Sequence, residues 1–294
     1  MRYHIVHTTT YTYDRPVSLQ PHVLRLRPRC DGCQTLRSFS LDVIPEPAGI
    51  YQVIDLEGNA VVRVWFREPT EQLWFKVTSE VETHRTNPFE FLLEPWATTL
   101  PIDYPASVLS DLQPYFHRYG STSSVDPAIA QLAQEIHQSV SGEPVAFLSE
   151  LNQRIHRNCQ HMIRETGSPF PAGFTWSQKL GSCRDLSVLF MEACRALGLA
   201  ARFVSGYQEG DPNQEKRDLH AWVEVYLPGA GWRGYDPTNG LAVADRHVTL
   251  VASALPHHAA PVSGSFRGEG IQLGMQYHIL IHESVGKFTE GSSR

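Results

Sequence analysis

The sequence predicts an α+β protein in which a buried helix packs against an antiparallel sheet, with an antiparallel β domain before this core. Apolar and polar residues alternate through much of the stretch from residue 2 to about 85, which is typical of half-buried strands. A later segment, 183–197, is apolar almost all the way round a helix, which indicates burial at the centre of a domain. Three strand-like runs follow it, so helix and sheet are arranged as in α+β folds.

The N-terminal part is predicted to be the β domain. Proline or glycine separates its alternating runs, and "EGN" at 57–59 suits a hairpin turn. From 87 to 114, five prolines interrupt every possible helix, so we expect an extended connection there. The predicted division is a β-rich domain with its linker at 1–115 and a core with a C-terminal strand at 116–294.

Helices open the predicted core. Asp126 suits a helix N-cap and Pro127 the first helical position, and 143–158 carries apolar residues at helical spacing. The buried helix is expected to stop at Gly198, because glycine readily adopts the left-handed backbone at a helix end. The strand-like runs after it are "ARFVSGY", "HAWVEVYL" and "WRGYDP".

Composition excludes several classes of protein. The 294 residues are 41% hydrophobic, and 25 basic against 31 acidic residues give a net charge of -6 without a charged block, so neither nucleic acid nor a membrane surface is an expected partner. No run of about 18 apolar residues occurs and no apolar signal segment opens the chain, so we expect a cytoplasmic location. Five cysteines are odd in number, which leaves at least one thiol free.

Cys183 is the candidate nucleophile. It stands at the start of the buried helix, after Gly181 and Ser182. The unpaired peptide N–H groups there favour a thiolate over a thiol and can hold an oxyanion. The alternative is that Cys183 is a small buried hydrophobe, as free cysteines often are.

His220 and Asp236 complete a possible catalytic triad. His220 opens one strand-like run and Asp236 closes the next, so the chain offers a nucleophile, a base and a carboxylate that orients the base. The triad requires both side chains on one face of the hairpin. Paired residue numbers must then have an even sum, as in 220 with 236, which needs an odd number of turn residues or a bulge. Otherwise His220 only ends a strand.

The motifs "GSCRDLSVLFMEACRALGLAARFVSGY" and "HAWVEVYLPGAGWRGYDPTNG" resemble the core of the bacterial transglutaminase-like family, which is related in fold to papain-type cysteine peptidases. The opening "MRYHIVHTTTYTYDRPVSLQPHVLRLRPR" is similar to the β-rich region that precedes this core in bacterial members. The resemblance implies that Cys183 is the nucleophile, His220 the general base and Asp236 the orienting carboxylate. Many relatives have an aromatic residue near "NCQHM", so Gln160 and His161 are candidates for a side chain in the oxyanion hole, beside the backbone N–H of Cys183.

Other motifs have plainer interpretations. "CDGC", with Cys30 and Cys33, lacks further ligands nearby, so a turn with two thiols is preferred to a zinc or redox site. Cys194 lies too far along the helix from Cys183 for a disulfide and is assigned to the core. The polar loop 208–218 is expected beside the active site, where it would gate access. No cofactor or metal is expected.

The predicted function is thiol-dependent acyl chemistry on an amide or peptide bond of a protein or peptide substrate. Water as acceptor gives a cysteine peptidase or amidase, and an amine as acceptor gives a protein-glutamine gamma-glutamyltransferase. The resemblance to bacterial members slightly favours hydrolysis. A non-catalytic binding module on the same fold is the alternative of another class, and the intact triad counts against it. The residues leave the natural substrate, oligomeric state and pathway open.

Overall fold

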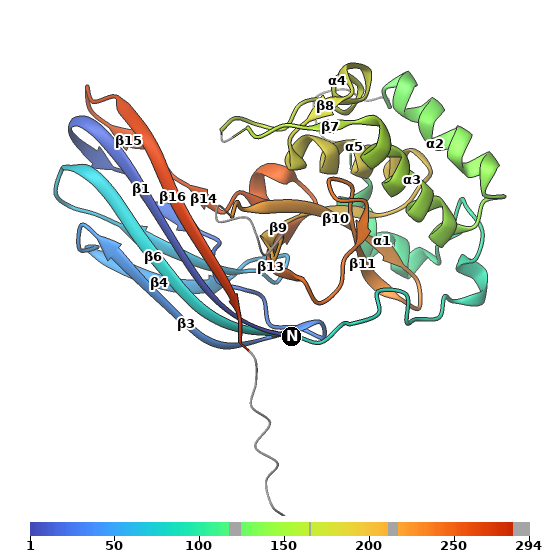
Figure 1. Ribbon diagram of the computed structural model, residues 1–294, viewed down its shortest axis with the longest axis horizontal. Coiled ribbons are helices and arrows are strands. Elements are labelled where there is room, and N and C mark those ends of the chain that lie inside the picture. The colour runs from blue at the N-terminus through green and yellow to red at the C-terminus, as the bar shows by residue number, and fades with distance from the viewer. Residues whose placement is uncertain (118–124, 165, 211–216, 285–294) are drawn as a thin grey trace, which may run out of the picture.

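The computed structural model describes residues 1–117, 125–164, 166–210 and 217–284. Two sheets built largely from the N-terminal part lie beside a core in which helices cover one antiparallel sheet (Figure 1). The predicted α+β class, with a buried helix against an antiparallel sheet and a β-rich part before it, is confirmed. One core cluster runs through both parts, since buried residues of the N-terminal sheets and of the central helix belong to it.

Long antiparallel strands form the N-terminal sheets. The first sheet has the order β15-β1-β6-β3, and β16 also pairs with β1. Its strands are β1 (Arg2–Leu19), β3 (Gln34–Ile44), β6 (Thr70–Thr83), β15 (Phe266–Arg267) and β16 (Gln272–Glu283). The second sheet has the order β14-β2-β5-β4, from β2 (His22–Leu24), β4 (Gly49–Ile54), β5 (Ala60–Trp65) and β14 (Val262–Ser263). Alternate residues of β1 and β6 are buried, as the period of two predicts.

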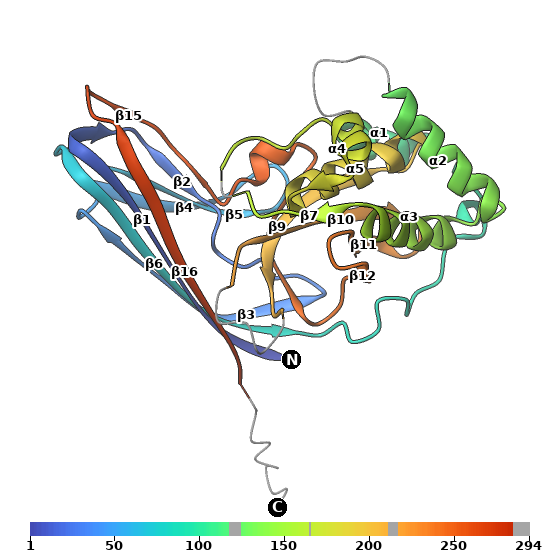
Figure 2. The same cartoon turned by 45° about the horizontal axis from the view of Figure 1, so that its top comes forward.

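The C-terminal strand belongs to the first sheet rather than to the core. Its pairs run from Tyr3 with Glu283 to Tyr13 with Gln272, and Figure 2 shows β16 alongside β1. The prediction had grouped this strand with the core, and its hydrogen bonds correct that grouping. The physical reason is that β1 pairs with β6 on one side and needs a neighbour on the other, which the end of the chain supplies. The division at 115/116 itself stays a prediction.

The linker prediction was wrong in one segment. Residues 106–116 form the helix α1 (Ala106–Phe116), which contains Pro114 near its end. Pro105 precedes its first residue, and no proline interrupts the stretch between these two. A proline close to the C-terminal end removes one helical hydrogen bond but leaves the earlier turns intact. The short 3-10 helix η1 (Pro95–Ala97) lies in the same linker.

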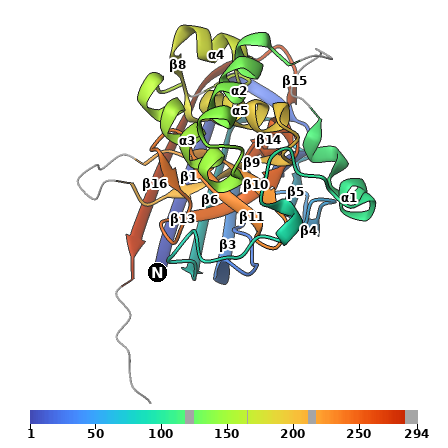
Figure 3. The same cartoon turned by 90° about the vertical axis from the view of Figure 1, so that its right-hand side faces the viewer.

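The core is built around α5 (Cys183–Ala196), which is buried along most of its length, as predicted. Asp126 caps α2 by accepting a hydrogen bond from the Ala128 N–H at 2.9 Å, which confirms the predicted cap. Seen from the helical side, α2, α3 and α4 surround α5 with the sheets behind them (Figure 3). The helices are α2 (Pro127–Ser139), α3 (Pro144–Asn158), α4 (Ala172–Gln178) and the 3-10 helix η2 (Pro256–Ala259).

The core sheet has the order β12-β11-β10-β9-β13. Its strands are β9 (Ala201–Gln208), β10 (His220–Leu227), β11 (Gly231–Asp236), β12 (Leu241–Ala242) and β13 (His247–Ser253). A separate parallel pair, β7 (Gln160–His161) and β8 (Leu180–Gly181), lies beside the start of α5.

The hairpin between β10 and β11 has the register that the triad requires. Leu227 pairs with Gly231 and Val223 with Tyr235, so paired numbers have an even sum. Continued by one residue, this register sets Asp236 opposite Trp222, on the face that His220 shares. The even register and the odd turn length are confirmed, while the example of 220 paired with 236 was wrong by two residues.

Gly229 holds this turn against the linker. Its φ is +86°, and a Cβ built on it would lie 2.6 Å from the carbonyl oxygen of Leu92 and 2.7 Å from the nitrogen of Glu94. The Glu94 N–H donates to the Pro228 carbonyl at 2.9 Å, so the contact is between backbones. Neither the turn nor the backbone of Leu92–Glu94 can shift to make room without losing this hydrogen bond.

Gly229→Ala should therefore lower the free energy of unfolding by about 2–3 kcal/mol, since alanine adds a backbone clash to the left-handed penalty of about 1–2 kcal/mol. Gly231→Ala is the matched control, because Gly231 has φ +74° and open space around its Cβ position. Urea denaturation of both variants measures the difference. Equal losses would mean that the turn does not press on the linker.

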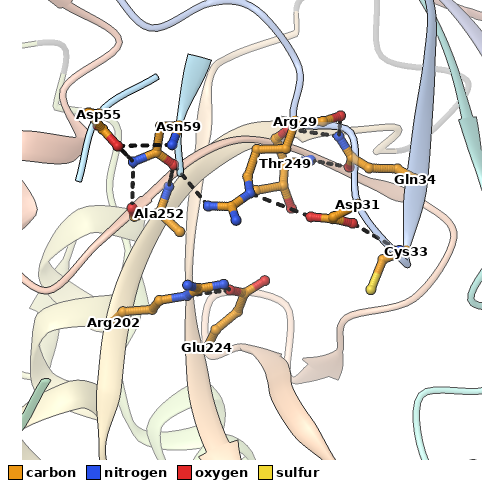
Figure 4. Close-up of polar contacts among 10 residues, drawn as sticks. All are labelled: Arg29, Asp31, Cys33, Gln34, Asp55, Asn59, Arg202, Glu224, Thr249 and Ala252. Carbon is orange, nitrogen blue, oxygen red and sulfur yellow. Dashed lines mark hydrogen bonds and ion pairs between the residues drawn. The ribbon is translucent and has the colours of Figure 1, made fainter. Parts of the chain in front are cut away.

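Polar side chains of the N-terminal part cover the outer edge of β13 (Figure 4). The Gln34 amide accepts from the Thr249 N–H at 2.8 Å and donates to the Thr249 carbonyl at 2.9 Å. Asn59 does the same for Ala252, at 2.9 Å in both directions. Two buried amides thus take the place of a neighbouring strand and join the two parts of the molecule.

Candidate active site

Cys183 is the first residue of α5, and a polar cluster fixes that end of the helix. The Asp185 carboxylate accepts hydrogen bonds from the Ser182 backbone N–H at 2.8 Å and the Ser182 hydroxyl at 2.7 Å. Its other oxygen accepts from Arg164 at 2.6 Å. Asp185 thus has a structural role in the first turn of the helix, which leaves the half-buried Cys183 at the helix N-terminus with a fixed backbone.

His220 and Asp236 meet across the hairpin. The Nε2 of His220 lies 2.8 Å from Oδ2 of Asp236, whose side chain is fully buried. The turn after β11 supplies two more donors to this carboxylate, because the N–H groups of Thr238 and Asn239 lie 3.0 and 3.2 Å from Oδ1. The Asn239 amide donates to Oδ2 at 2.8 Å. Burial would raise the pKa of Asp236, but the charge and hydrogen bond of His220, together with those of His247, hold it well below its usual range.

The thiol and the imidazole stabilise each other's charged forms. Burial would raise the pKa of Cys183, but hydrogen bonds from His161 and His220 lower it to about 6. Burial would lower the pKa of His220, but the charge and hydrogen bond of Asp236, with a smaller effect from Cys183, raise it to about 10. Between these two values the pair is a thiolate and an imidazolium, which is the reactive form of a nucleophilic cysteine.

Cys183 opens into a cleft of about 520 Å³ between the core and the first N-terminal sheet. Residues of the core on its wall include His161, Arg184 and Asn239, and those of β1 and β16 include Tyr11 and Met275. The predicted loop 208–218 borders it through Gln208, Gly210, Arg217 and Asp218. Residues 211–216 of that loop lie outside the described residues. The cleft is therefore shared by both parts of the chain.

The structure separates the two oxyanion candidates. β7 runs parallel to β8 and sets His161 opposite Gly181, close to Cys183 in the chain. His161 lines the cleft, whereas Gln160 pairs with Leu180 and does not. His161 is thus the side chain available beside the thiol.

A second histidine at Asp236 was not predicted from the sequence. The Nε2 of the buried His247 lies 3.2 Å from Oδ2 of Asp236, and its ring makes a T-shaped contact with Trp222 at a centroid distance of 5.2 Å. His247 opens β13, which no short motif connects to Asp236. The Asn239 contact had a signal, because "DPTN" is typical of a turn in which an Asp side chain binds N–H groups two and three residues on.

The other four cysteines do not line this cleft, and one of them, Cys159, is buried at the end of α3. Cys30 and Cys33 are free thiols in the segment before β3, and Cys194 is buried in α5. Burial raises the pKa of Cys194, as expected for a core residue. Among the described residues, none of the helices is long and apolar enough to cross a membrane.

Two family models match the chain. Residues 3–82 match the bacterial transglutaminase-like N-terminal region, and residues 130–237 match the transglutaminase-like superfamily. The second match contains Cys183, His220 and Asp236.

Individual proteins are similar over different lengths. An uncharacterised protein of Mycobacterium leprae is 25% identical over 279 residues, which is 92% of this chain and 94% of that protein. A protein-glutamine gamma-glutamyltransferase of Pseudomonas aeruginosa is 32% identical over 127 residues, 40% of this chain and 19% of that protein. The crystal structure of a proposed cysteine protease from Cytophaga hutchinsonii superposes with a TM-score of 0.71 at 21% identity, over 97% of this chain and 91% of that one. This last likeness is one of fold.

Proposed function

The chain belongs to the transglutaminase-like superfamily, and we propose that it is a cysteine-dependent enzyme that cleaves amide or peptide bonds of a protein or peptide substrate. Cys183 is the nucleophile, His220 moves the proton, and Asp236 orients and charges His220. The observation that carries the proposal is the 2.8 Å contact between His220 and the buried Asp236, on the face from which His220 reaches Cys183. A binding module has no need of this pair of charges.

The first half of the proposed reaction forms a thioester. The Cys183 thiolate attacks the carbonyl carbon of the substrate amide, and the C–N bond breaks as the His220 imidazolium gives its proton to the leaving nitrogen. The acyl group stays on sulfur. The backbone N–H of Cys183, at the helix N-terminus, and the His161 side chain are the donors for the oxyanion of the tetrahedral intermediate.

The second half releases the acyl group. Neutral His220 takes a proton from water, the water oxygen attacks the thioester carbon, and the C–S bond breaks. This yields a carboxylic acid and restores the thiolate and imidazolium. A primary amine in place of water yields a new amide. We favour water, and transfer to an amine is the second candidate because the Pseudomonas aeruginosa relative is a glutamyltransferase.

Incubation of β-casein with the protein, with and without a fluorescent primary amine, should distinguish these reactions. We expect peptide fragments or conversion of glutamine to glutamate in both samples, little amine incorporation, and no product from Cys183→Ala. Mass spectrometry of the casein measures all three. Amine incorporation that exceeds hydrolysis would assign the transferase. Casein binding without any product would support the binding module.

A further inference from the structure

The outer edge of β16 lies open beside the active-site cleft. β16 pairs with β1 on one side, and no strand of the described residues pairs with its other side. The Ser284 N–H donates to the Arg2 carbonyl at 2.7 Å, which identifies the even-numbered residues from Gly274 to Ser284 as those bonded to β1. Hydrogen bonds alternate along antiparallel strands. The N–H and C=O groups of odd-numbered residues, such as Met275, Ile279 and Ile281, therefore point outward.

Within the described residues, this edge lacks the usual protection against pairing, apart from one bulge near its start, where Thr12 pairs with Gly274 and Tyr13 with Gln272. From 271 to 282 the sequence is "IQLGMQYHILIH", without Lys, Arg, Asp, Glu or Pro. Natural edges are commonly protected by charges, prolines, bulges or a cover. The β3 edge carries Arg37, Asp42 and a bulge, and amide side chains cover β13. Compared with the β3 and β13 edges, the outer edge of β16 is the one on which another strand could pair.

The open edge is continuous with the site that holds Cys183. Met275 and Tyr277 line the same cleft as the nucleophile. The Tyr277 hydroxyl donates to Asp218 at 2.6 Å, which ties β16 to the segment that leads into His220. A strand added beside β16 would lie about 4.8 Å from it, with alternate side chains on the cleft side. Its backbone would be held while those side chains enter the cleft.

We propose that the outer edge of β16 binds an extended segment of the protein substrate as an added strand and so presents it to Cys183. This inference rests on the proposed function and names its substrate class: proteins with an unfolded or extended segment, held through backbone hydrogen bonds. The N-terminal region then has a direct part in substrate binding. Specificity for sequence comes from the side chains that enter the cleft, and the edge itself accepts many sequences.

Met275→Pro tests the edge, with Met275→Ala as its matched control. Both variants lose the methionine side chain, but only proline loses the outward N–H, and an outward position at an edge tolerates proline. Both are made in Cys183→Ala protein, and binding of fluorescent β-casein is measured by anisotropy. We expect about 10-fold weaker binding for proline than for alanine. Equal binding by the two variants, or no binding of casein by either, overturns the proposal.

Two further measurements separate the possible failures. With Cys183 present, labelling of both variants by iodoacetamide should still rise near pH 6, because the thiol and its histidine partner are unchanged. If the proposed function is wrong, Cys183 will label only in the ordinary pH range of cysteine and casein will give no product. The binding comparison between the two Met275 variants would still test the edge. Sedimentation of the unmodified chain completes the test. A dimer that Met275→Pro dissociates would assign the edge to a second copy and overturn the proposal.

Discussion

Replacing Asp236 with asparagine should lower kcat/KM for casein by about 10³- to 10⁴-fold, as loss of an orienting carboxylate does in other triads. The buried carboxylate is the main group that raises the pKa of His220 to about 10. A neutral amide cannot stabilise the imidazolium, so the pKa of His220 falls. Without its cationic partner, the Cys183 thiolate also loses stabilisation, and the pKa of the thiol rises from about 6. The variant would hold a protonated thiol at neutral pH.

The rate of iodoacetamide labelling against pH measures this change. In the unmodified chain, Cys183 is a neutral thiol below about pH 6 and a thiolate paired with imidazolium from there to about pH 10. Labelling should therefore rise near pH 6 and rise again above pH 10, where the thiolate loses its partner. In Asp236→Asn the first rise should move upward toward the ordinary cysteine range of about 8.5.

Cys183→Ala is the control for this profile, because Cys30 and Cys33 are partly or fully exposed and also react. Subtracting its labelling isolates the rate at Cys183. Asn239→Ala tests the supporting donors, since Asp236 keeps four other contacts in that variant, and a much smaller change is expected. If Asp236→Asn kept its first rise near pH 6, the carboxylate would not control the thiol.

Local patterns were enough to predict the elements that carry the proposed nucleophile and base. The apolar residues around α5 and the alternation of apolar and polar residues in β10 are both visible within a short stretch of sequence. Both elements form as predicted. The turn between β10 and β11 was harder, because its length fixes which face Asp236 takes. The sequence could state the required register, and the structure supplies it through the turn at Gly229.

Contacts between distant segments could not be predicted in the same way. The pairing of Tyr3 with Glu283 joins the two ends of the described chain, and no local pattern selects one partner for β1 over another. In the core sheet, β10 and β9 lie between β11, which ends at Asp236, and β13, which begins at His247. His247 reaches Asp236 only through this strand order. His161 was a candidate through family resemblance alone, and its position depends on the parallel pair β7 and β8. These contacts depend on topology.

Arg195, a cation near the C-terminal end of the buried helix, makes further contacts of this kind. Its side chain is 0% exposed. It donates to the carbonyls of Tyr115 at 3.0 Å and of Ala201 and Ala254 at 2.8 Å each, and it lies 3.2 Å from Glu192. The guanidinium thus joins the end of α5 to α1, to β9 and to the segment after β13. A planar guanidinium offers five N–H donors in a fixed arrangement, against three on an ammonium, so it can serve these three carbonyls and Glu192 together.

Arg195→Met should therefore lower the free energy of unfolding by about 3–5 kcal/mol, the usual cost of removing one partner of a buried ion pair. Methionine fills much of the volume but leaves three buried carbonyls without this donor, and water cannot replace it without a cavity. Arg157→Met is the control, because Arg157 is exposed on α3, and a change within about 0.5 kcal/mol is expected there. Urea denaturation measures both. A loss at Arg195 no larger than that at Arg157 would mean that the guanidinium's hydrogen bonds only balance the cost of burying its charge, and that the core could be closed as well by an apolar side chain.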